Sequence, residues 1–128
     1  MPERVPTSGW TESGGNVHVS PIRVFYEDTD AIGLVYYANH LKFAERARTE
    51  MLRLAGAGQR ELMEKDGIGF IVRRCEVDYI APARLDDALE VHSSLLRLGG
   101  ASLRIVQTIR RGGTDLSRLI LRIACVSR

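Results

Sequence analysis

The chain has 128 residues and a formal net charge of +2, which allows one domain with a sizeable core but not two. A charge so close to neutral argues against non-specific nucleic-acid binding, which requires a strong basic excess on one face. No apolar run reaches the roughly 20 residues that span a bilayer, and the Pro-, Ser- and Gly-rich N-terminus lacks the apolar segment of a signal peptide. We therefore expect a cytoplasmic protein.

The two cysteines and the internal histidines give no sign of a metal centre. Cys75 and Cys125 are far apart, and neither belongs to a Cys-x-x-Cys pair or to a Cys/His cluster with zinc spacing. Both lie in apolar runs, and we expect both to be buried, reduced thiols. We interpret His40 as a structural or surface histidine, and His92 as one with no acidic partner nearby in sequence.

The first half of the chain predicts an arm, a strand and a helix. Residues 1–15 are typical of a disordered or loosely docked arm, which leaves 16–128 as the domain. Alternating apolar residues predict a strand over 17–26, with Pro21 at an edge or a bulge. Apolar residues at helical spacing then predict one long amphipathic helix over about residues 38–55.

From Gly69 onward the apolar period changes to two, which predicts strands. Four of them are indicated, over 69–80, 88–98, 102–110 and 116–126, the later ones joined by Gly-Gly turns. Strands joined by tight turns pair antiparallel. The helix can bury its apolar stripe only on this sheet, so we expect an α+β fold with a five-stranded antiparallel sheet and one long helix. The exposed edges of such a sheet favour pairing with a second copy.

The candidate chemistry lies between the first strand and the helix. Three acids, Glu27, Asp28 and Asp30, precede a turn with Gly33 and a helix that Asn39 can cap. A helix start offers unpaired N–H groups and the positive end of the helix dipole. A carboxylate beside such an anion site suits acyl transfer. The same acids also occur as ordinary caps or solvated loop residues.

Two sequence blocks carry a family likeness that extends over about residues 20–126. The first is Tyr26-Glu-Asp-Thr-Asp-Ala-x-Gly-x-Val-Tyr-Tyr-Ala-Asn39, continued by Glu45-Arg-Ala-Arg-Thr-Glu-Met-Leu-Arg53. The second is Val77-Asp-Tyr-Ile-Ala-Pro-Ala-Arg-Leu-Asp-Asp87. Together they resemble the hotdog-fold acyl-CoA thioesterases, above all the branch associated with the Tol-Pal cell-envelope system, which is related to 4-hydroxybenzoyl-CoA thioesterase.

This resemblance implies a hotdog fold in which the sheet wraps the central helix and two subunits join their sheets. It implies active sites at the dimer interface, commonly in a homotetramer, and hydrolysis of an acyl-CoA to free acid and CoA. Coenzyme A would be part of the substrate, with no metal and no bound cofactor. A peripheral link to membrane or cell-envelope proteins is also implied.

By position, the resemblance makes Asp30 the catalytic aspartate. Seven residues further on, the Tol-Pal branch has His and the hydroxybenzoyl branch has Tyr, and this chain has Tyr37. Asp30 can attack the thioester to give a mixed anhydride, or it can deprotonate water. Backbone N–H groups from Gly33 to Tyr37 are candidates for the oxyanion hole, with Gly33 permitting close approach of the backbone. The Tyr37 side chain can hydrogen-bond the carbonyl or pack against the thioester.

Other residues are candidates for substrate binding. Arginines suit the phosphates of CoA, apolar strand residues suit the acyl chain, and Asn39 can shape the site. The candidates are Asn39, Ile71, Val72, Arg73, Arg74, Arg110 and Arg111. The arginines can equally be solvated residues, and the two apolar residues can equally belong to the core. We interpret Glu27 and Asp28 as structural.

Two rival functions also fit parts of this sequence. The run Asp28-Thr-Asp30 imitates the Asp-x-Asp of magnesium-dependent haloacid-dehalogenase-type phosphatases, but that chemistry sits on a parallel sheet, whereas an antiparallel one is predicted here. The second rival is a hotdog domain that binds acyl thioesters, or serves as an envelope-complex adaptor, without turnover.

Overall fold

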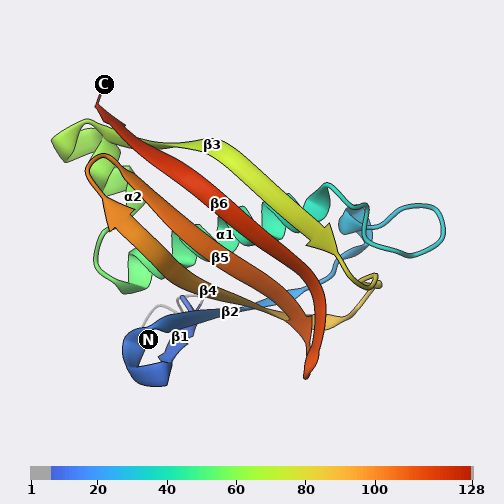
Figure 1. Cartoon of the computed structure of the whole chain (residues 1–128). Coiled ribbons are helices and arrows are strands. Elements are labelled where there is room, and N and C mark those ends of the chain that lie inside the picture. Colours follow the sequence, from blue (N-terminus) through green and yellow to red (C-terminus); the bar gives the residue numbers. More distant parts are fainter. Residues whose placement is uncertain (1–6, 128) are drawn as a thin grey trace, which may run out of the picture.

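The computed structural model describes residues 7–127, which form one antiparallel sheet with a helix across one face (Figure 1). The strand order in the sheet is β1-β2-β4-β5-β6-β3. The strands are β1 (Trp10–Glu12), β2 (Val17–Arg23), β3 (Ile68–Tyr79), β4 (Ala88–Gly99), β5 (Ser102–Arg111) and β6 (Thr114–Ser127). The helices are α1 (Asn39–Leu54) and the short α2 (Gln59–Glu61), with single helical turns at Ser13–Gly15, Tyr26–Asp28 and Leu62–Asp66.

The α+β architecture is as predicted, but the sheet has six strands and not five. The additional strand is β1, in which Trp10 pairs with Val19 and Glu12 pairs with Val17. These residues belong to the stretch that was expected to be a disordered or loosely docked arm. All three residues of β1 are exposed, so the strand is held by backbone pairing at the sheet edge and carries no apolar signature. Residues 1–6 of that arm lie outside the described residues.

The helix is also shorter than predicted. It has 16 residues, and the chain then forms only short helical turns before β3. Gly56 adopts a φ of 78°, a left-handed conformation that stops a helix and that glycine adopts without strain. Among residues 7–127, no helix is long and apolar enough to cross a membrane.

The core lies between α1 and the sheet. On the helix, Phe43, Ala44 and Ala47 are fully buried. On β5 and β6 buried and less buried residues alternate along much of each strand, so that one face of the sheet meets α1 and the other faces outward. The core residues from the strands and their connections are Val24, Ala83, Leu89, Val91, Ile105, Ile109, Leu116, Leu119, Leu121 and Ile123.

One polar network crosses this core and joins the helix to two strands. The fully buried Gln107 side chain donates to the backbone oxygen of Ala44 at 2.9 Å and to Ser93 Oγ at 3.0 Å. Its Oε1 accepts a hydrogen bond from Arg48 Nη1 at 2.9 Å. Burial lowers the pKa of Arg48. These bonds fix the helix on β4 and β5, because each buried donor would lose its partner if the helix shifted.

We predict that Phe43→Ala destabilises the protein by about 3–5 kcal/mol, because it leaves a cavity between α1 and the sheet. Phe43 is fully buried, whereas Leu98 is 72% exposed at the end of β4. Leu98→Ala is therefore the control and should change the free energy of unfolding by no more than about 0.5 kcal/mol. Urea unfolding measures both, and equal effects of the two substitutions would contradict the assigned core.

Candidate active site

The segment between β2 and α1 projects beyond the N-terminal end of the helix as a narrow loop (Figure 1). Thr29 and Val35 form an isolated bridge across it, and the Asp30 N–H donates to the Leu34 oxygen at 2.8 Å. Gly33 lies at the turn with a φ of 81°, which requires glycine or strain. The loop therefore presents Asp30 near its tip.

The Asp30 carboxylate holds this loop in shape with one oxygen. Its Oδ1 accepts hydrogen bonds from the backbone N–H groups of Ile32 at 3.0 Å and Leu34 at 3.2 Å. Within residues 7–127 nothing donates a hydrogen bond to Oδ2, and the side chain is exposed. The arrangement fixes the direction of the carboxylate and leaves one charged oxygen for chemistry.

Most of the backbone amides near Asp30 are already used. From residue 32 to residue 41, each N–H donates within the described part of the chain except those of Tyr37 and Ala38. The Gly33 N–H, which was one candidate for the oxyanion hole, donates to the Asp30 oxygen at 3.2 Å. The backbone N–H groups that remain as candidates for the oxyanion hole are therefore those of Tyr37 and Ala38, which directly precede α1.

The second motif block, which ends in the corner 81–87, forms hydrogen bonds with the Asp30 loop of the first block. The Val35 N–H donates to the Ala83 oxygen at 2.8 Å, and the Leu85 N–H donates to the Gly33 oxygen at 3.1 Å. The corner from residue 81 to residue 87 thus lies against the Asp30 loop, although about 50 residues separate the two in sequence. This contact explains why two distant motifs belong to one site.

Asn39 does not cap the helix, contrary to the sequence-based expectation. It is the first residue of α1, the preceding position is Ala38, and the Asn39 side chain donates to the Asp28 oxygen at 2.9 Å. The Asp28 side chain is buried and accepts a hydrogen bond from the Phe25 N–H at 2.9 Å. The Asn39 side chain thus ties the loop to the helix start, and the Asp28 side chain holds the turn that follows Phe25, which agrees with the structural interpretation of Asp28.

An aromatic cluster lies over the same helix start. The rings of Tyr36 and Tyr37 are 4.8 Å apart, and Tyr79 meets Tyr37 edge-on at 5.9 Å. The Tyr79 hydroxyl donates to the Tyr37 backbone oxygen at 2.9 Å. The Tyr37 carbonyl belongs to the same peptide unit as the Ala38 N–H, so this hydrogen bond holds that unit in place. Sequence reasoning missed the contact of Tyr79 with this segment.

His40 lies beneath this cluster and is 3% exposed. Its Nδ1 is 2.7 Å from Ser117 Oγ, and its ring meets Tyr79 edge-on at 5.2 Å. Burial lowers the pKa of His40, so the imidazole is neutral near pH 7. The structural interpretation of His40 is therefore confirmed. His92 differs from expectation, because Glu90 lies 3.0 Å from its Nε2, two residues away on the same face of β4.

The other predicted binding residues do not gather around Asp30. Ile71 and Val72 are 50% and 45% exposed on the edge strand β3, so they are not core residues. Arg110 pairs with Asp115 at 2.8 Å, and Arg111 pairs with Asp87 at 2.8 Å. Both of these arginines stabilise the hairpin and the 81–87 corner, so in this conformation they are engaged within the fold.

Arg73 and Arg74 take different positions on β3. Arg73 lies at an irregularity in the pairing with β6, between Val72 and Arg74. Arg74 pairs with Glu76 at 2.8 Å. In the described residues, no group of three or more His, Cys, Asp or Glu side chains is arranged to hold a metal ion. Cys75 is exposed and Cys125 is half-buried, so the expectation that both cysteines are buried is wrong.

Comparison with known proteins agrees with the fold and with the site described above. A family model described as "Thioesterase-like superfamily" matches residues 24–128. The chain belongs to this superfamily. It is 42% identical over 106 residues to the acyl-CoA thioesterase YbgC of Haemophilus influenzae, covering 83% of this chain and 78% of that protein. It is 46% identical over 107 residues to the acyl-CoA thioester hydrolase YbgC of Escherichia coli O6:H1, covering 83% and 79%.

A solved structure agrees with these relatives. The probable thioesterase from Bartonella henselae superposes with a TM-score of 0.84 at 34% identity, covering 88% of this chain and 93% of the other. The matched family region begins at Val24 and so includes both the Asp30 loop and the 81–87 corner. The two structural features that build the candidate site therefore belong to the part of the chain that defines the family.

The burial of His40 in this superfamily member predicts a pH dependence of stability. Because its pKa in the folded state is below the ordinary value of 6.5, the neutral form contributes stability at higher pH that is lost as the pH falls. We predict that the free energy of unfolding decreases from about pH 7 to about pH 5, and that it decreases less in His40→Gln. Urea unfolding across this range tests it; equal pH dependence in both proteins would refute the assignment.

Proposed function

We propose that this chain is an acyl-CoA thioesterase, with Asp30 as the nucleophile or general base. The observation that carries the proposal is the Asp30 carboxylate, which is fixed through Oδ1 and free at Oδ2 in the loop that precedes α1. The names and activities of the YbgC relatives support the substrate class. Neither a metal nor a bound cofactor takes part in the proposed reaction, since coenzyme A enters as part of the substrate.

Two routes follow from this geometry. In the first, Oδ2 attacks the thioester carbonyl, the C–S bond breaks, the CoA thiolate leaves, and water then hydrolyses the mixed anhydride. In the second, Asp30 takes a proton from a water molecule whose oxygen attacks the carbonyl, and the proton passes to the leaving thiolate. Both routes consume one water, release acid and CoA, and return Asp30 to its charged form.

The developing negative charge on the carbonyl oxygen requires donors. The amides of Tyr37 and Ala38 are unpaired within the described residues and lie next to the first turn of α1. The helix dipole is positive at this end and favours the same charge. We propose these two amides as the oxyanion hole, with Tyr79 holding the Tyr37 peptide through its carbonyl oxygen.

We predict that Asp30→Asn lowers kcat at least about a hundredfold and keeps the fold. The amide oxygen of Asn can still accept the hydrogen bonds from Ile32 and Leu34, so the loop keeps its shape while the charge is lost. Glu27→Gln is the control, because Glu27 is an exposed acid three residues away. Release of free thiol measures the rate; near-normal turnover in Asp30→Asn would remove Asp30 from the mechanism.

We also predict that Ala38→Pro lowers kcat by about 10²–10³-fold, the usual effect of removing one oxyanion donor. Ala38 has a φ of −66°, which proline adopts readily, so the substitution removes the N–H without forcing this angle. Ala38→Gly keeps the N–H and serves as the control. Thermal unfolding of both variants checks the fold, and equal kcat values for the two would exclude the Ala38 amide.

The site also requires cover from solvent, and we propose that a second copy provides it. Large apolar side chains around the loop are exposed, including Phe25, Ile32, Tyr36 and Tyr37. The strand β3 is an edge of the sheet and has free backbone groups along one side. The family resemblance predicts that this assembly is a homodimer or homotetramer. It also predicts a cytoplasmic location and a link to the Tol-Pal system.

A further inference from the structure

A cavity lies at the C-terminal end of α1, where the helix meets β1, β2 and β4. Its volume is about 210 Å³, and an apolar cavity of about 150 Å³ already holds a molecule the size of benzene. The Asp30 loop lies at the other end of the helix (Figure 1). Since α1 has 16 residues, about 24 Å of helix separates the two places.

The cavity has a buried polar base and an apolar mouth. At the base His18 and Ser93 are only 4% and 1% exposed, whereas most of the apolar lining residues are exposed. A ligand that enters with its polar group first therefore places that group against buried side chains and its apolar part against the mouth. The apolar lining residues are Met51, Leu54, Ala55 and Leu95.

One ring nitrogen of His18 has no partner. Its Nε2 lies 2.6 Å from the backbone oxygen of Ser8, which can only accept, so Nε2 carries a proton. Among residues 7–127, His18 Nδ1 is the one buried side-chain nitrogen or oxygen without a hydrogen-bond partner. Because buried polar atoms are normally paired, this nitrogen is the first recognition group of the cavity.

Ser93 supplies the second recognition group. Arg48 Nη1 donates to Gln107 Oε1, which fixes the orientation of the amide, and Gln107 Nε2 donates to Ser93 Oγ at 3.0 Å. The Ser93 hydroxyl accepts in that bond, so its own proton is left for another partner. His18 lies directly opposite Ser93 in the register of β2 and β4, yet within the described chain no hydrogen bond joins the two side chains.

The N-terminal segment builds one side of the cavity. Thr11 and His18 line it, and both precede Val24, where the match to the family begins. Gly9 has a φ of 81°, and a side chain there would collide with the backbone oxygen of Val19. The segment therefore lies against β2 at a distance that requires glycine. Part of the cavity thus comes from residues outside the region that matches the family.

We propose that this cavity binds a free monocarboxylic acid with an apolar chain. One carboxyl oxygen shares a proton with His18 Nδ1, and the other accepts the proton of Ser93 Oγ. A carboxyl group suits Nδ1 in either state, because the acid donates to a bare nitrogen and the carboxylate accepts from a protonated one. A thioester has a single oxygen and no proton, so the two groups select a free acid over an acyl-CoA.

The free acid is also the class of product that the proposed reaction releases. Only this link rests on the proposed function, since the recognition groups are read from the cavity itself. Asp30→Asn should therefore bind the acid as tightly as the unaltered chain does. Loss of turnover in that variant bears on the proposed function and not on the cavity.

Titration calorimetry of the full chain with octanoate tests the site without a catalytic readout. We expect saturable binding that weakens at least about tenfold in His18→Gln, a usual contribution of one hydrogen bond to a charged group. Glutamine can still donate to the Ser8 oxygen but has no group at the position of Nδ1. His92→Gln is the matched control, because His92 is next to Ser93 in β4 and faces the other side of the sheet.

The base and the mouth of the cavity are tested separately. Methyl octanoate keeps the chain but has no acidic proton and no charge, so it should bind at least about tenfold more weakly than octanoate. If apolar contact alone drove binding, the ester would bind at least as tightly as the acid, which would overturn the proposal. Ala55→Leu narrows the mouth and should weaken octanoate binding, whereas Ala101→Leu, in the exposed turn after β4, should not.

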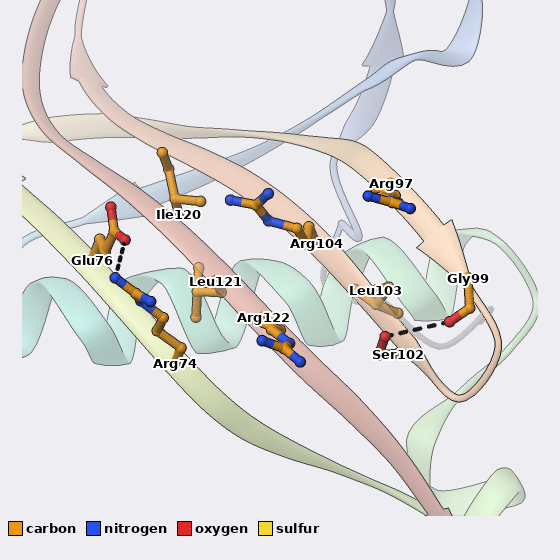
Figure 2. A pocket seen from close by; sticks show the side chains of 10 residues that line it. All are labelled: Arg74, Glu76, Arg97, Gly99, Ser102, Leu103, Arg104, Ile120, Leu121 and Arg122. Atoms are coloured by element: carbon orange, nitrogen blue, oxygen red, sulfur yellow. Dashed lines mark hydrogen bonds and ion pairs between the residues drawn. The ribbon is translucent and has the colours of Figure 1, made fainter.

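Exposed arginines are the other place where a carboxylate can bind. Figure 2 shows Arg97, Arg104 and Arg122 on neighbouring strands, on the face of the sheet that points away from α1. Arg104→Gln is therefore a further control and should leave octanoate binding unchanged. Loss of binding in Arg104→Gln but not in His18→Gln would locate the acid on that outer face and would contradict the proposal.

Thermal unfolding supplies a second measurement of binding. Octanoate should raise the Tm of the unaltered chain and of His92→Gln, and should raise that of His18→Gln much less. Hydrogen exchange at the backbone amides of β1 checks that this strand stays paired in His18→Gln, and Ala55→Leu tests the cavity without altering His18. Equal binding by the unaltered chain and His18→Gln, or no saturable binding by the unaltered chain, would overturn the proposal.

Discussion

The hydrogen bonds from two backbone amides to one oxygen of Asp30 are the interaction on which the candidate site depends. They close the loop between β2 and α1 and fix the direction of the carboxylate. The second oxygen, Oδ2, stays free because the N–H groups of Ile32 and Leu34 both donate to Oδ1. The Asp30 side chain thus both stabilises the loop and supplies the free oxygen. Its charge can be removed without removing the hydrogen bonds that shape the loop.

The rest of the fold supplies the support for this loop. The network from Arg48 through Gln107 to Ser93 fixes α1 on the sheet, so the helix start has a defined position. The 81–87 corner bonds to the loop from the other side, and Arg111 in turn ties this corner to β5. A site on an exposed loop is therefore held by contacts with the helix, the corner and the sheet, as preorganised chemistry requires.

Much of this was predictable from the sequence, and the errors have a common cause. Periodicity located the helix and strands β2 to β6, and the motif at Asp30 indicated the site. Periodicity cannot show which residues from different parts of the chain contact each other in the fold. The strand β1 is held by backbone pairing alone, Asn39 bonds to the Asp28 oxygen and not to its own helix, and Arg110 and Arg111 find carboxylates within the fold.

The central claim is that the chain turns over acyl-CoA and does not merely bind it. The direct measurement is release of free thiol by the purified protein from a panel of short-chain, long-chain and aromatic acyl-CoAs, with binding of each measured in parallel. The account predicts repeated turnover of at least one member of the panel. Tight binding of an acyl-CoA with no thiol released above the buffer rate, for every member, would contradict it and identify a binding module.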